Sequence, residues 1–328
     1  GAKNGRRLIT ALIKLGFAGV SETALGAQQV SSMTGRLLHE AENGIYISSA
    51  CPVAVEFIEK YLNNPNCRVL DLLSPAQVHA RMLHRIYGDN IKVVFIGPCI
   101  GKKKEAARTP ELLDAALTFT EFENWLKEAG LELRSLPESA GCFVPEAAEE
   151  GNLYPIEGGM LTTIMERNTD ADTVYLTLAG LNNLASVLGS AKAETGRKVF
   201  IEALACDNGC INGPGCRKDD QLGHLADIAA LRAGNLQTSL NRKIEVSGKT
   251  SQQMPSVVHE PVDDGRITAV LRNIGKYSRN DELNCGSCGY STCRQCAAAI
   301  RENKAEPAMT LQTFFAGQPI LMSIICAP

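Results

Sequence analysis

Twelve cysteines stand in this chain of 328 residues, and several of them lie three to five residues apart. Thiols at such short spacing are well placed to share a metal, because the thiolate is the metal-binding form of cysteine. Secreted proteins that depend on disulfides are usually much shorter than this chain. We therefore expect a cytoplasmic protein whose reduced cysteines bind metal ions or iron–sulfur clusters.

Two groups of cysteines carry this expectation. In the first, Cys206 and Cys210 precede a glycine-rich run (CDNGCINGPG), and glycine lets a backbone pass close to a bulky cofactor because it has no Cβ. The second group, in CGSCGYSTCRQC, has the spacing C-x2-C-x4-C-x2-C. Its members are Cys285, Cys288, Cys293 and Cys296. Four thiolates suit a 4Fe–4S cluster, and they suit a structural zinc ion equally well.

The elements that must position these cysteines follow from the hydrophobic pattern. Runs such as IKVVFI, TVYLTL and KVFIEAL are typical of buried strands, and segments with helical spacing alternate with them. The predicted strands are 44–49, 91–96, 173–178 and 198–204. The predicted helices are 7–15, 28–42, 52–62, 74–87, 110–129, 180–195, 221–233, 266–275 and 297–303. This alternation predicts an α/β fold with largely parallel sheets.

Three cysteines directly follow predicted strands. Cys51 comes after GIYISSA, Cys99 after KVVFIGP and Cys206 after KVFIEALA. Ligands of α/β folds gather at the carboxyl ends of strands, and cysteines used only for packing would not all fall there. We expect Cys51, Cys99, Cys206 and Cys210 to enclose one cluster, because iron–sulfur clusters usually take four thiolates.

The segments around these cysteines resemble the three motifs of FeFe (iron-only) hydrogenases, which read TSCCPxW, MPCxxKKxE and ExMxCxxGCxxGG. The chain has SSACPVA at 48–54, GPCIGKKKE at 97–105 and EALACDNGCINGPG at 202–215, in the same order. LGFAGVSET and YPIEGGM are also similar to that family. The resemblance covers residues 5–218, and it implies two lobes of mostly parallel sheet flanked by helices around a buried cluster site.

The resemblance implies a ligand set for the H-cluster, which joins a 4Fe–4S cubane to a diiron carbonyl and cyanide unit. Cys51, Cys99, Cys206 and Cys210 match the cubane ligands. Cys210 matches the thiolate that also bridges to the diiron unit.

Further site residues follow from the same match. Lys102 matches a lysine that hydrogen-bonds a cyanide, which is a charge-assisted contact. Glu105 matches the acid that closes the second motif, and Glu202 matches the acid that opens the third.

The sequence departs from the family pattern at several of these positions. Ala50 stands where the family has a proton-relaying cysteine, and a methyl group cannot carry a proton. Gly97 and Leu204 replace two methionines, and Val53 and Ala54 follow Pro52 where a tryptophan is expected. This pattern is similar to the sensory branch of the family, so we expect slow turnover that serves hydrogen or redox sensing.

The second cysteine group resembles a small 4Fe–4S module that follows the hydrogenase core in sensory relatives. That module takes its fourth cysteine just after an AEPxM stretch, but here AEPAM is followed by Thr310. Cys296 is the nearest replacement in sequence, and Cys326 is one only if the tail folds back. A site with three cysteines also remains open.

The resulting domain prediction has four parts. Residues 1–218 form the hydrogenase-like domain, 219–262 a connecting segment, 263–310 the small iron–sulfur module and 311–328 an irregular tail. The first residues are Gly-Ala-Lys without an initiator Met, which suggests a domain excised from a longer protein. The implied partners are H2 and protons, maturation proteins, and an electron-transfer or signalling domain outside this chain.

Composition weighs against other classes of partner. The net charge of −3 gives no reason to expect nucleic acid or an anionic membrane surface. No apolar run approaches the ~20 residues that span a bilayer. The five histidines show no ligand spacing, and Cys67, Cys142 and Cys216 are expected to serve packing.

Two other functions are compatible with the same residues. One is an iron–sulfur scaffold or electron-transfer protein that holds the cubane but never receives the diiron unit; Lys102 and Cys210 weigh against it. The other is a pure signalling module in which turnover is incidental, and Ala50 favours that alternative.

Overall fold

The computed structural model describes residues 5–138, 143–145, 148, 150–165, 172–192, 196–216, 223, 226, 248–249, 263–284, 288, 290–302 and 304–307. The chain falls into two compact units, Gly1–Val257 and Val258–Pro328, and each is described by itself. The predicted helix at 221–233 and the tail at 311–328 lie almost entirely outside the described residues.

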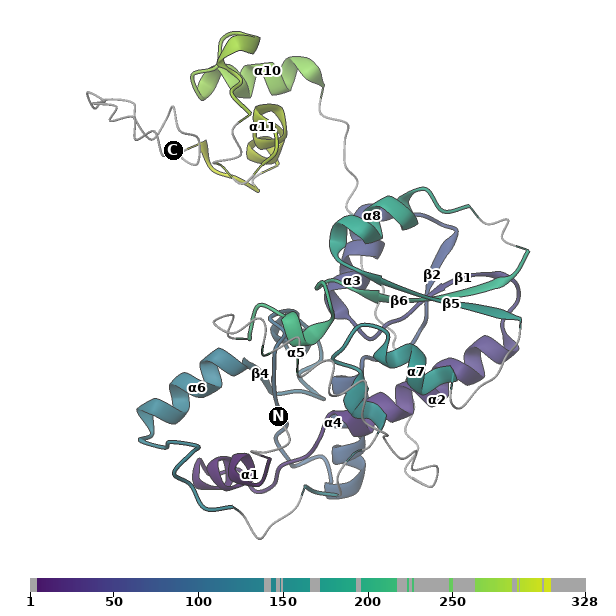
Figure 1. Ribbon diagram of the computed structural model, residues 1–328, viewed down its shortest axis with the longest axis vertical. Helices are drawn as coiled ribbons and strands as arrows, with labels where there is room; N and C mark the ends of the chain where they lie inside the picture. Colours follow the sequence, from purple (N-terminus) through teal and green to yellow (C-terminus); the bar gives the residue numbers. More distant parts are fainter. Residues whose placement is uncertain are drawn as a thin grey trace. The chain divides into compact units, whose positions relative to one another are not determined.

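The first unit alternates helices and strands along the chain (Figure 1). Its helices are α1 (Gly5–Lys14), α2 (Ala24–Glu40), α3 (Pro52–Phe57), α4 (Pro75–Tyr87), α5 (Gly101–Arg108), α6 (Phe119–Glu128), α7 (Gly159–Met165) and α8 (Leu181–Gly189). Its strands are β1 (Gly44–Ile47), β2 (Cys67–Val69), β3 (Val94–Gly97), β4 (Ala115–Thr118), β5 (Thr173–Ala179) and β6 (Lys198–Leu204). The short helical turns are η2 (Ile58–Leu62), η3 (Glu150–Leu153) and η4 (Cys210–Asn212).

These strands form two separate parallel sheets, which confirms the predicted α/β class. The larger sheet has the order β2-β1-β6-β5, and the smaller pairs β3 with β4. Every described pairing is parallel, including Ile45 with Val199 and Val94 with Ala115. Parallel neighbours require crossover connections, which the helices supply.

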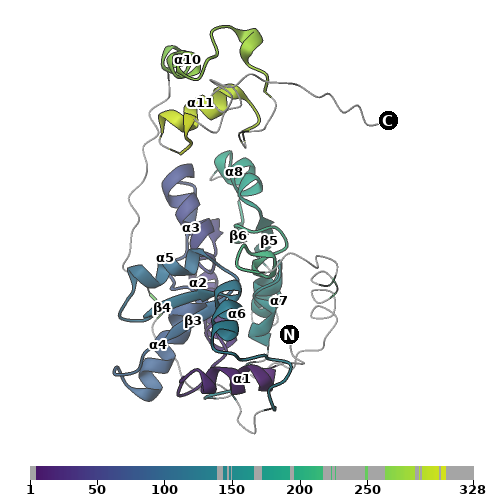
Figure 2. The ribbon, with the colours of Figure 1, turned by 90° about the vertical axis from the view of Figure 1, so that its left-hand side faces the viewer.

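Helices cover both faces of the larger sheet. Side chains alternate across a strand, so Tyr46 and Phe200 join one core while Ile45, Ile47 and Ile201 join another. The first core is completed by α2 and α7, and the second by α3 and α8. Figure 2 shows these helix pairs on opposite sides of β5 and β6. A sheet buried on both faces explains why its strands read as continuous apolar runs.

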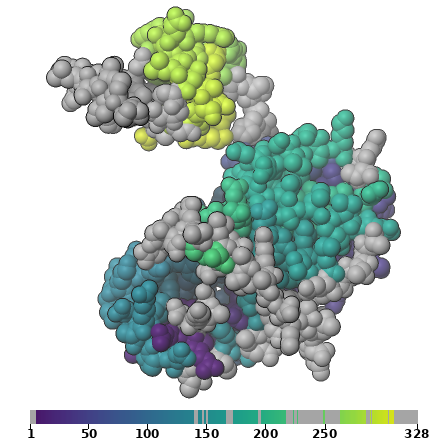
Figure 3. Space-filling view, in the orientation of Figure 1, coloured from purple at the N-terminus to yellow at the C-terminus, as the bar shows by residue number. Residues whose placement is uncertain are grey.

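The smaller sheet builds the second lobe of the first unit. Ile96 of β3 packs against a core from α1 and α6 that contains Leu12, Phe122 and Leu126. Residues of α4, α5 and β4, such as Ala116, belong to the core that reaches the larger sheet. In the space-filling view, the teal surface of the larger-sheet lobe and the blue surface of α6 are distinct (Figure 3).

One predicted helix, 110–129, is wrong over its first half. Residues Ala115–Thr118 form β4 instead, and the helix begins only at Phe119. Two effects decide this. Parallel pairing with β3 holds the segment extended, and Thr118 and Glu121 form a reciprocal capping box that starts α6.

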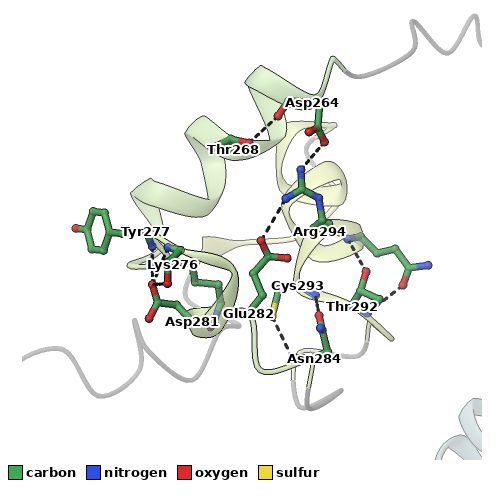
Figure 4. Close-up of polar contacts among 12 residues, drawn as sticks. Asp264, Thr268, Lys276, Tyr277, Asp281, Glu282, Asn284, Thr292, Cys293 and Arg294 are labelled. Carbon is green, nitrogen blue, oxygen red and sulfur yellow. Dashed lines mark hydrogen bonds and ion pairs between the residues drawn. The ribbon is translucent and has the colours of Figure 1, made fainter.

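The second unit is a small helical module. It contains α10 (Asp264–Asn273), the turn η5 (Arg279–Asp281) and α11 (Cys293–Arg301). Leu271 and Ile274 pack against Cys293 and Ala297 of α11. Arg294 pairs with both Glu282 and Asp264, which ties the intervening loop to the two helices (Figure 4). No helix in the described part of the chain is long and apolar enough to cross a membrane.

Candidate functional site

Cys51 stands at the N-cap of α3, just after β1. Its sulfur receives hydrogen bonds from the backbone N–H groups of Ala54 and Ala205. Ala205 directly precedes Cys206, so the exits of β1 and β6 meet at this thiol. Burial raises the pKa of Cys51 above its ordinary value, and the two N–H donors oppose that rise.

Cys210 lies within the electrostatic reach of the other three thiols of the first group. Burial raises its pKa most, and the charges of Cys51, Cys99 and Cys206 raise it further. The ammonium of Lys102 lowers the same pKa. The structure therefore brings together all four cysteines that follow β1, β3 and β6, with one buried cation beside them.

The glycines after Cys210 join the two lobes. The N–H of Gly215 donates to the carbonyl of Pro98 at 2.8 Å, and Pro98 directly precedes Cys99. A Cβ on Gly213 or Gly215 would lie 2.6 or 2.7 Å from that carbonyl oxygen. The sequence pattern predicted a close approach of this backbone to a cofactor, which stays a prediction; the close approach that the structure describes is to Pro98. This contact holds the Cys210 loop against the Cys99 loop.

Lys102 is buried and held by two partners. Its Nζ donates to Ser74 Oγ at 2.8 Å and to Glu105 Oε2 at 2.7 Å. Lysine has three N–H donors, and the third meets no protein acceptor among the described residues. Ser74 is itself fixed, because it forms a capping box with Gln77 at the start of α4.

Ser49 carries a buried polar atom close to Cys51 in the sequence. Its Oγ is buried and has no hydrogen-bond partner among the described residues. An unsatisfied buried hydroxyl is costly, and Ser49 stands two residues before Cys51. A polar group bound near Cys51 would remove that cost.

The donor set fits an iron–sulfur cluster. It offers four thiols and a buried cation that has one N–H without a protein acceptor among the described residues, and both suit an anionic cofactor. Among the described residues, no three His, Cys, Asp or Glu side chains converge on a single metal ion. A cubane binds each thiolate through a different iron, so it needs no such convergence.

Glu202 is nearly fully buried, at 1% exposure, on β6. Its Oε1 accepts from the N–H of Met160 at 3.1 Å, and its Oε2 accepts from Thr177 Oγ1 at 3.2 Å. Burial raises the pKa of Glu202 to about 7, and the charge of Glu157 contributes to the rise. Glu202 therefore caps the start of α7 and changes its protonation near neutral pH.

Other predicted residues occupy simpler positions. Ala50 packs against the core between the larger sheet and α2. Cys67 packs against the core on the α3 and α8 face. His79 is buried, and its ring bonds Ser21 Oγ at 2.8 Å. Cys142 lies outside the described residues.

The second cysteine group is partly described. Cys288, Cys293 and Cys296 are free thiols, and the latter two are buried on α11. The pKa of Cys296 is raised to about 11, first by burial and then by a hydrogen bond and charge from Cys288. Cys285, Thr310 and Cys326 lie outside the described residues.

Two lobes of parallel sheet around clustered thiols define an α/β iron–sulfur protein. Residues 2–214 match the family model "Iron only hydrogenase large subunit, C-terminal domain", and the chain belongs to this family. Residues 281–309 match a second model, whose description is "Putative Fe-S cluster".

Proteins of two kinds are similar to this chain. Iron hydrogenase 1 of Clostridium pasteurianum is 24% identical over 64% of this chain and 45% of its own length. Cytosolic Fe-S cluster assembly factor NAR1 of Eremothecium gossypii is 27% identical over 59% of this chain and 57% of its own. The chain thus spans about half the length of these curated relatives.

Solved structures show the same fold. A variant of the FeFe-hydrogenase HydA1 from Chlamydomonas reinhardtii superposes with a TM-score of 0.54. The match has 24% sequence identity and covers 72% of this chain and 80% of that one. The two-lobed α/β architecture predicted from the sequence is confirmed.

Sequence reasoning missed the residues that hold Lys102. Ser74 was predicted only as a helix start, and its partner Lys102 stands 28 positions later. The motif S-x-x-Q at 74–77 predicts a capping box. No local pattern indicates that the Ser74 hydroxyl will also accept a hydrogen bond from Lys102. Ser49 was not singled out either, since a buried hydroxyl without a partner has no sequence signature.

Replacing Lys102 by Met should destabilise the cluster-free protein by about 3 kcal/mol, because it leaves the buried carboxylate of Glu105 without its cation. Lys103→Met is the matched control. Lys103 pairs with Glu121 at the surface, so that loss should stay below about 1 kcal/mol. Urea unfolding followed by the single tryptophan, Trp125, measures both; equal losses would contradict a structural role for the buried pair.

Glu202 should make stability depend on pH. Because its pKa rises from 4.5 to about 7 on folding, the unfolded chain ionises first, and stability is lost as pH rises through this window. Relative to Glu202→Gln, the wild type should lose roughly 2–3 kcal/mol between about pH 5 and about pH 8. Urea unfolding at several pH values measures this difference. The exposed Glu128→Gln should show no such trend, and a flat Glu202 difference would refute the shift.

Proposed function

We propose that the first unit holds an H-cluster and reversibly converts dihydrogen into two protons and two electrons. The observation that carries the proposal is the grouping of four thiols and the buried Lys102 at the ends of β1, β3 and β6. Membership of the iron-only hydrogenase family supports it. When bound, the diiron unit would supply the heterolytic splitting of dihydrogen, and the protein supplies its position and surroundings.

Cys51, Cys99, Cys206 and Cys210 would hold the cofactor as thiolates. Burial opposes ionisation of Cys51 and Cys210, so the thiolate forms require the compensating charge of iron. The N–H groups of Ala54 and Ala205 that bond Cys51 would then draw electron density from its sulfur. Such hydrogen bonds and burial are the means by which a protein sets the potential of a cluster.

Lys102 would orient an anionic ligand of the cofactor. Ser74 and Glu105 use two of its N–H groups and fix the ammonium at 2.8 and 2.7 Å. The remaining N–H is the one that can donate to a cyanide. Glu105 acts here as a positioning residue, because it touches Lys102 rather than the cofactor.

Proton movement limits the expected rate. Ala50 has no group that can accept or donate a proton. Glu202 is a buried carboxyl that takes up and releases a proton near pH 7, and it would hold a proton at Oε1 or Oε2 inside the first unit. Slow turnover of this kind suits hydrogen or redox sensing in the cytoplasm better than bulk hydrogen production.

The second unit would carry an additional 4Fe–4S cluster, as its family match supports. That cluster would pass electrons, or report its redox state, to an electron-transfer or signalling domain. Maturation proteins would build the diiron unit of the first site.

A second candidate function is an iron–sulfur scaffold that binds the cubane alone. Two observations favour it. Ala50 removes the thiol on which fast proton transfer depends, and relatives named cytosolic Fe-S cluster assembly factors are as similar to this chain as the hydrogenases are.

Infrared absorption of protein matured anaerobically separates the two functions. An H-cluster gives bands from metal-bound cyanide and carbonyl, and these should shift under dihydrogen. Lys102→Met should move the cyanide bands in particular, because it removes a charged donor. A protein with full iron–sulfur loading, active maturation partners and no such bands would exclude the H-cluster and leave the scaffold.

Ala50→Cys tests the proton-transfer explanation for slow turnover. A positioned proton carrier contributes about 100-fold or more to a rate, so hydrogen evolution should rise by about that factor. Ala50→Ser is the matched control of similar size with a much less acidic group. If the Ala50→Cys protein shows the infrared bands of the H-cluster but evolves hydrogen no faster than the wild type, the missing thiol is not what limits the rate.

A further inference from the structure

A buried backbone contact joins the segment that leads to the second unit with the surroundings of Lys102. Gly248 lies in this segment, which the sequence predicted only as a connection, and it is buried in the first unit. We infer that Gly248 is a positioning residue for Lys102. Its carbonyl fixes Leu73, and Leu73 directly precedes the serine that holds the ammonium. The importance of this role rests on the function proposed for Lys102, whereas its existence is tested in the cluster-free protein.

The N–H group of Leu73 is held by the Gly248 contact. Leu73 is 4% exposed, and its N–H donates to the Gly248 carbonyl at 2.5 Å. A buried N–H that loses its acceptor is costly. Earlier in the same stretch, the Leu70 N–H donates to the Ile47 carbonyl of β1 at 2.9 Å. The stretch from Leu70 to Leu73 is therefore held at one end by the larger sheet and at the other by Gly248.

Ser74 passes this constraint from Leu73 to Lys102. Ser74 is 2% exposed, and its Oγ accepts from Lys102 Nζ at 2.8 Å. Glu105, the other partner of this ammonium, lies on α5 together with Lys102 itself. Ser74 is therefore the described partner that fixes the ammonium relative to α4, and Gln77 and Leu73 fix Ser74 from its two sides. A shift of the chain at Leu73 moves the Ser74 hydroxyl relative to the ammonium.

Gly248 occupies a space that leaves no room for a side chain unless Met33 moves. A Cβ at Gly248 would lie 2.6 Å from both Sδ and Cε of Met33 and 3.4 Å from Leu72 Cδ2. The φ angle of Gly248 is not in the left-handed region, so this position requires glycine for space and not for backbone conformation. Met33 of α2 and the buried Leu72 belong to the core that reaches the larger sheet. The Gly248 contact is thus seated on a packed surface of the first unit.

This contact lies on the path of the chain toward the second unit, which begins at Val258. Displacement of Gly248 from Met33 would release the Leu73 N–H, and Lys102 would then lose a fixed partner. The remaining N–H of Lys102, which we propose donates to an anionic ligand, would lose its direction as well. A contact that served packing alone would leave Lys102 unaffected, and this difference can be measured.

Gly248→Val in the cluster-free full chain tests the first step. The added side chain should displace Gly248 from Met33 and break the bond to Leu73. The Leu73 amide should therefore exchange with solvent about tenfold faster, as measured by hydrogen exchange and mass spectrometry with fragmentation that resolves single amides. The Leu70 amide is the internal reference, because its acceptor is the Ile47 carbonyl and its rate should stay the same.

Acylation of buried lysines tests the second step. Gly248→Val should raise the rate at which an amine-reactive reagent modifies Lys102 by about three- to tenfold, because a hydrogen bond that holds its ammonium is weakened. Lys198 is the matched reference within the same protein. It is 9% exposed, against 7% for Lys102, and its Nζ donates to the Leu38 carbonyl of α2 at 3.0 Å. Peptide mass spectrometry follows both lysines, and the Lys198 rate should not change.

A compensating variant and two controls separate the contact from general destabilisation. Met33→Ala removes about as many side-chain atoms as valine adds, so the double variant Gly248→Val, Met33→Ala should return both rates toward the wild-type values. Gly189→Val makes the same change at a glycine where a Cβ would have no atom within 4 Å, and it should leave both rates unchanged. Gly248→Ala adds only a methyl group and should act in the same direction as Gly248→Val to a smaller extent, which keeps the test available if the valine variant does not fold.

Three results would overturn the inference. The first is a Leu73 amide that exchanges in the wild type as fast as an unprotected amide. The second is an equal rise at Leu70 and Leu73 in Gly248→Val, which would mean that the whole unit is destabilised. The third is faster exchange at Leu73 without faster acylation of Lys102 relative to Lys198, which would leave Gly248 a packing residue. These outcomes are independent of the infrared bands of an H-cluster, so failure here and failure of the proposed function are distinguishable.

Discussion

A buried thiol resists ionisation, because its thiolate would lose hydration inside the protein. Cys51 and Cys210 are under this constraint, and their pKa values are raised. The rest of the site opposes the effect. N–H groups from α3 and from the end of β6 point at Cys51, and the Lys102 ammonium acts on Cys51 and Cys210. The balance still favours the neutral thiol, so stable thiolates need iron, and cofactor binding is coupled to the electrostatics of the fold.

The parallel sheets determine why these thiols can meet. Strands of one parallel sheet all end at the same edge, and the loops that follow β1 and β6 deliver Cys51 and Cys206 there. Cys99 comes from a different sheet, so a second contact must align the two lobes. Gly215 provides it by bonding the Pro98 carbonyl at 2.8 Å. A side chain at Gly213 or Gly215 would force the lobes apart, which explains a glycine-rich run beside the last cysteine.

Features that depend on local pattern were predictable from the sequence, whereas long-range contacts were not. The buried strands and the positions of Cys51, Cys99 and Cys206 after them follow from apolar runs that end in cysteine. The helix expected at 110–129 failed because pairing with β3 outweighs the helical preference of 115–118. The contacts of Lys102 with Ser74, and of Asn284 with Cys293, join elements that no periodicity relates. Candidate ligands could therefore be named from spacing, but the groups that orient them required the structure.

The same fold can hold different cofactors, because a few side chains decide what its thiols support. Four cysteines suffice for a cubane, and relatives named hydrogenases and assembly factors share this part of the chain. An additional anionic ligand requires a hydrogen-bond donor such as the remaining N–H of Lys102. Rapid proton transfer requires an acidic side chain at the position that Ala50 occupies in this chain. This chain keeps the first and lacks the second. On the function proposed above, such a site would hold an anionic cofactor through Lys102 and exchange protons with it slowly, a combination that would suit detection of a gas better than its bulk conversion.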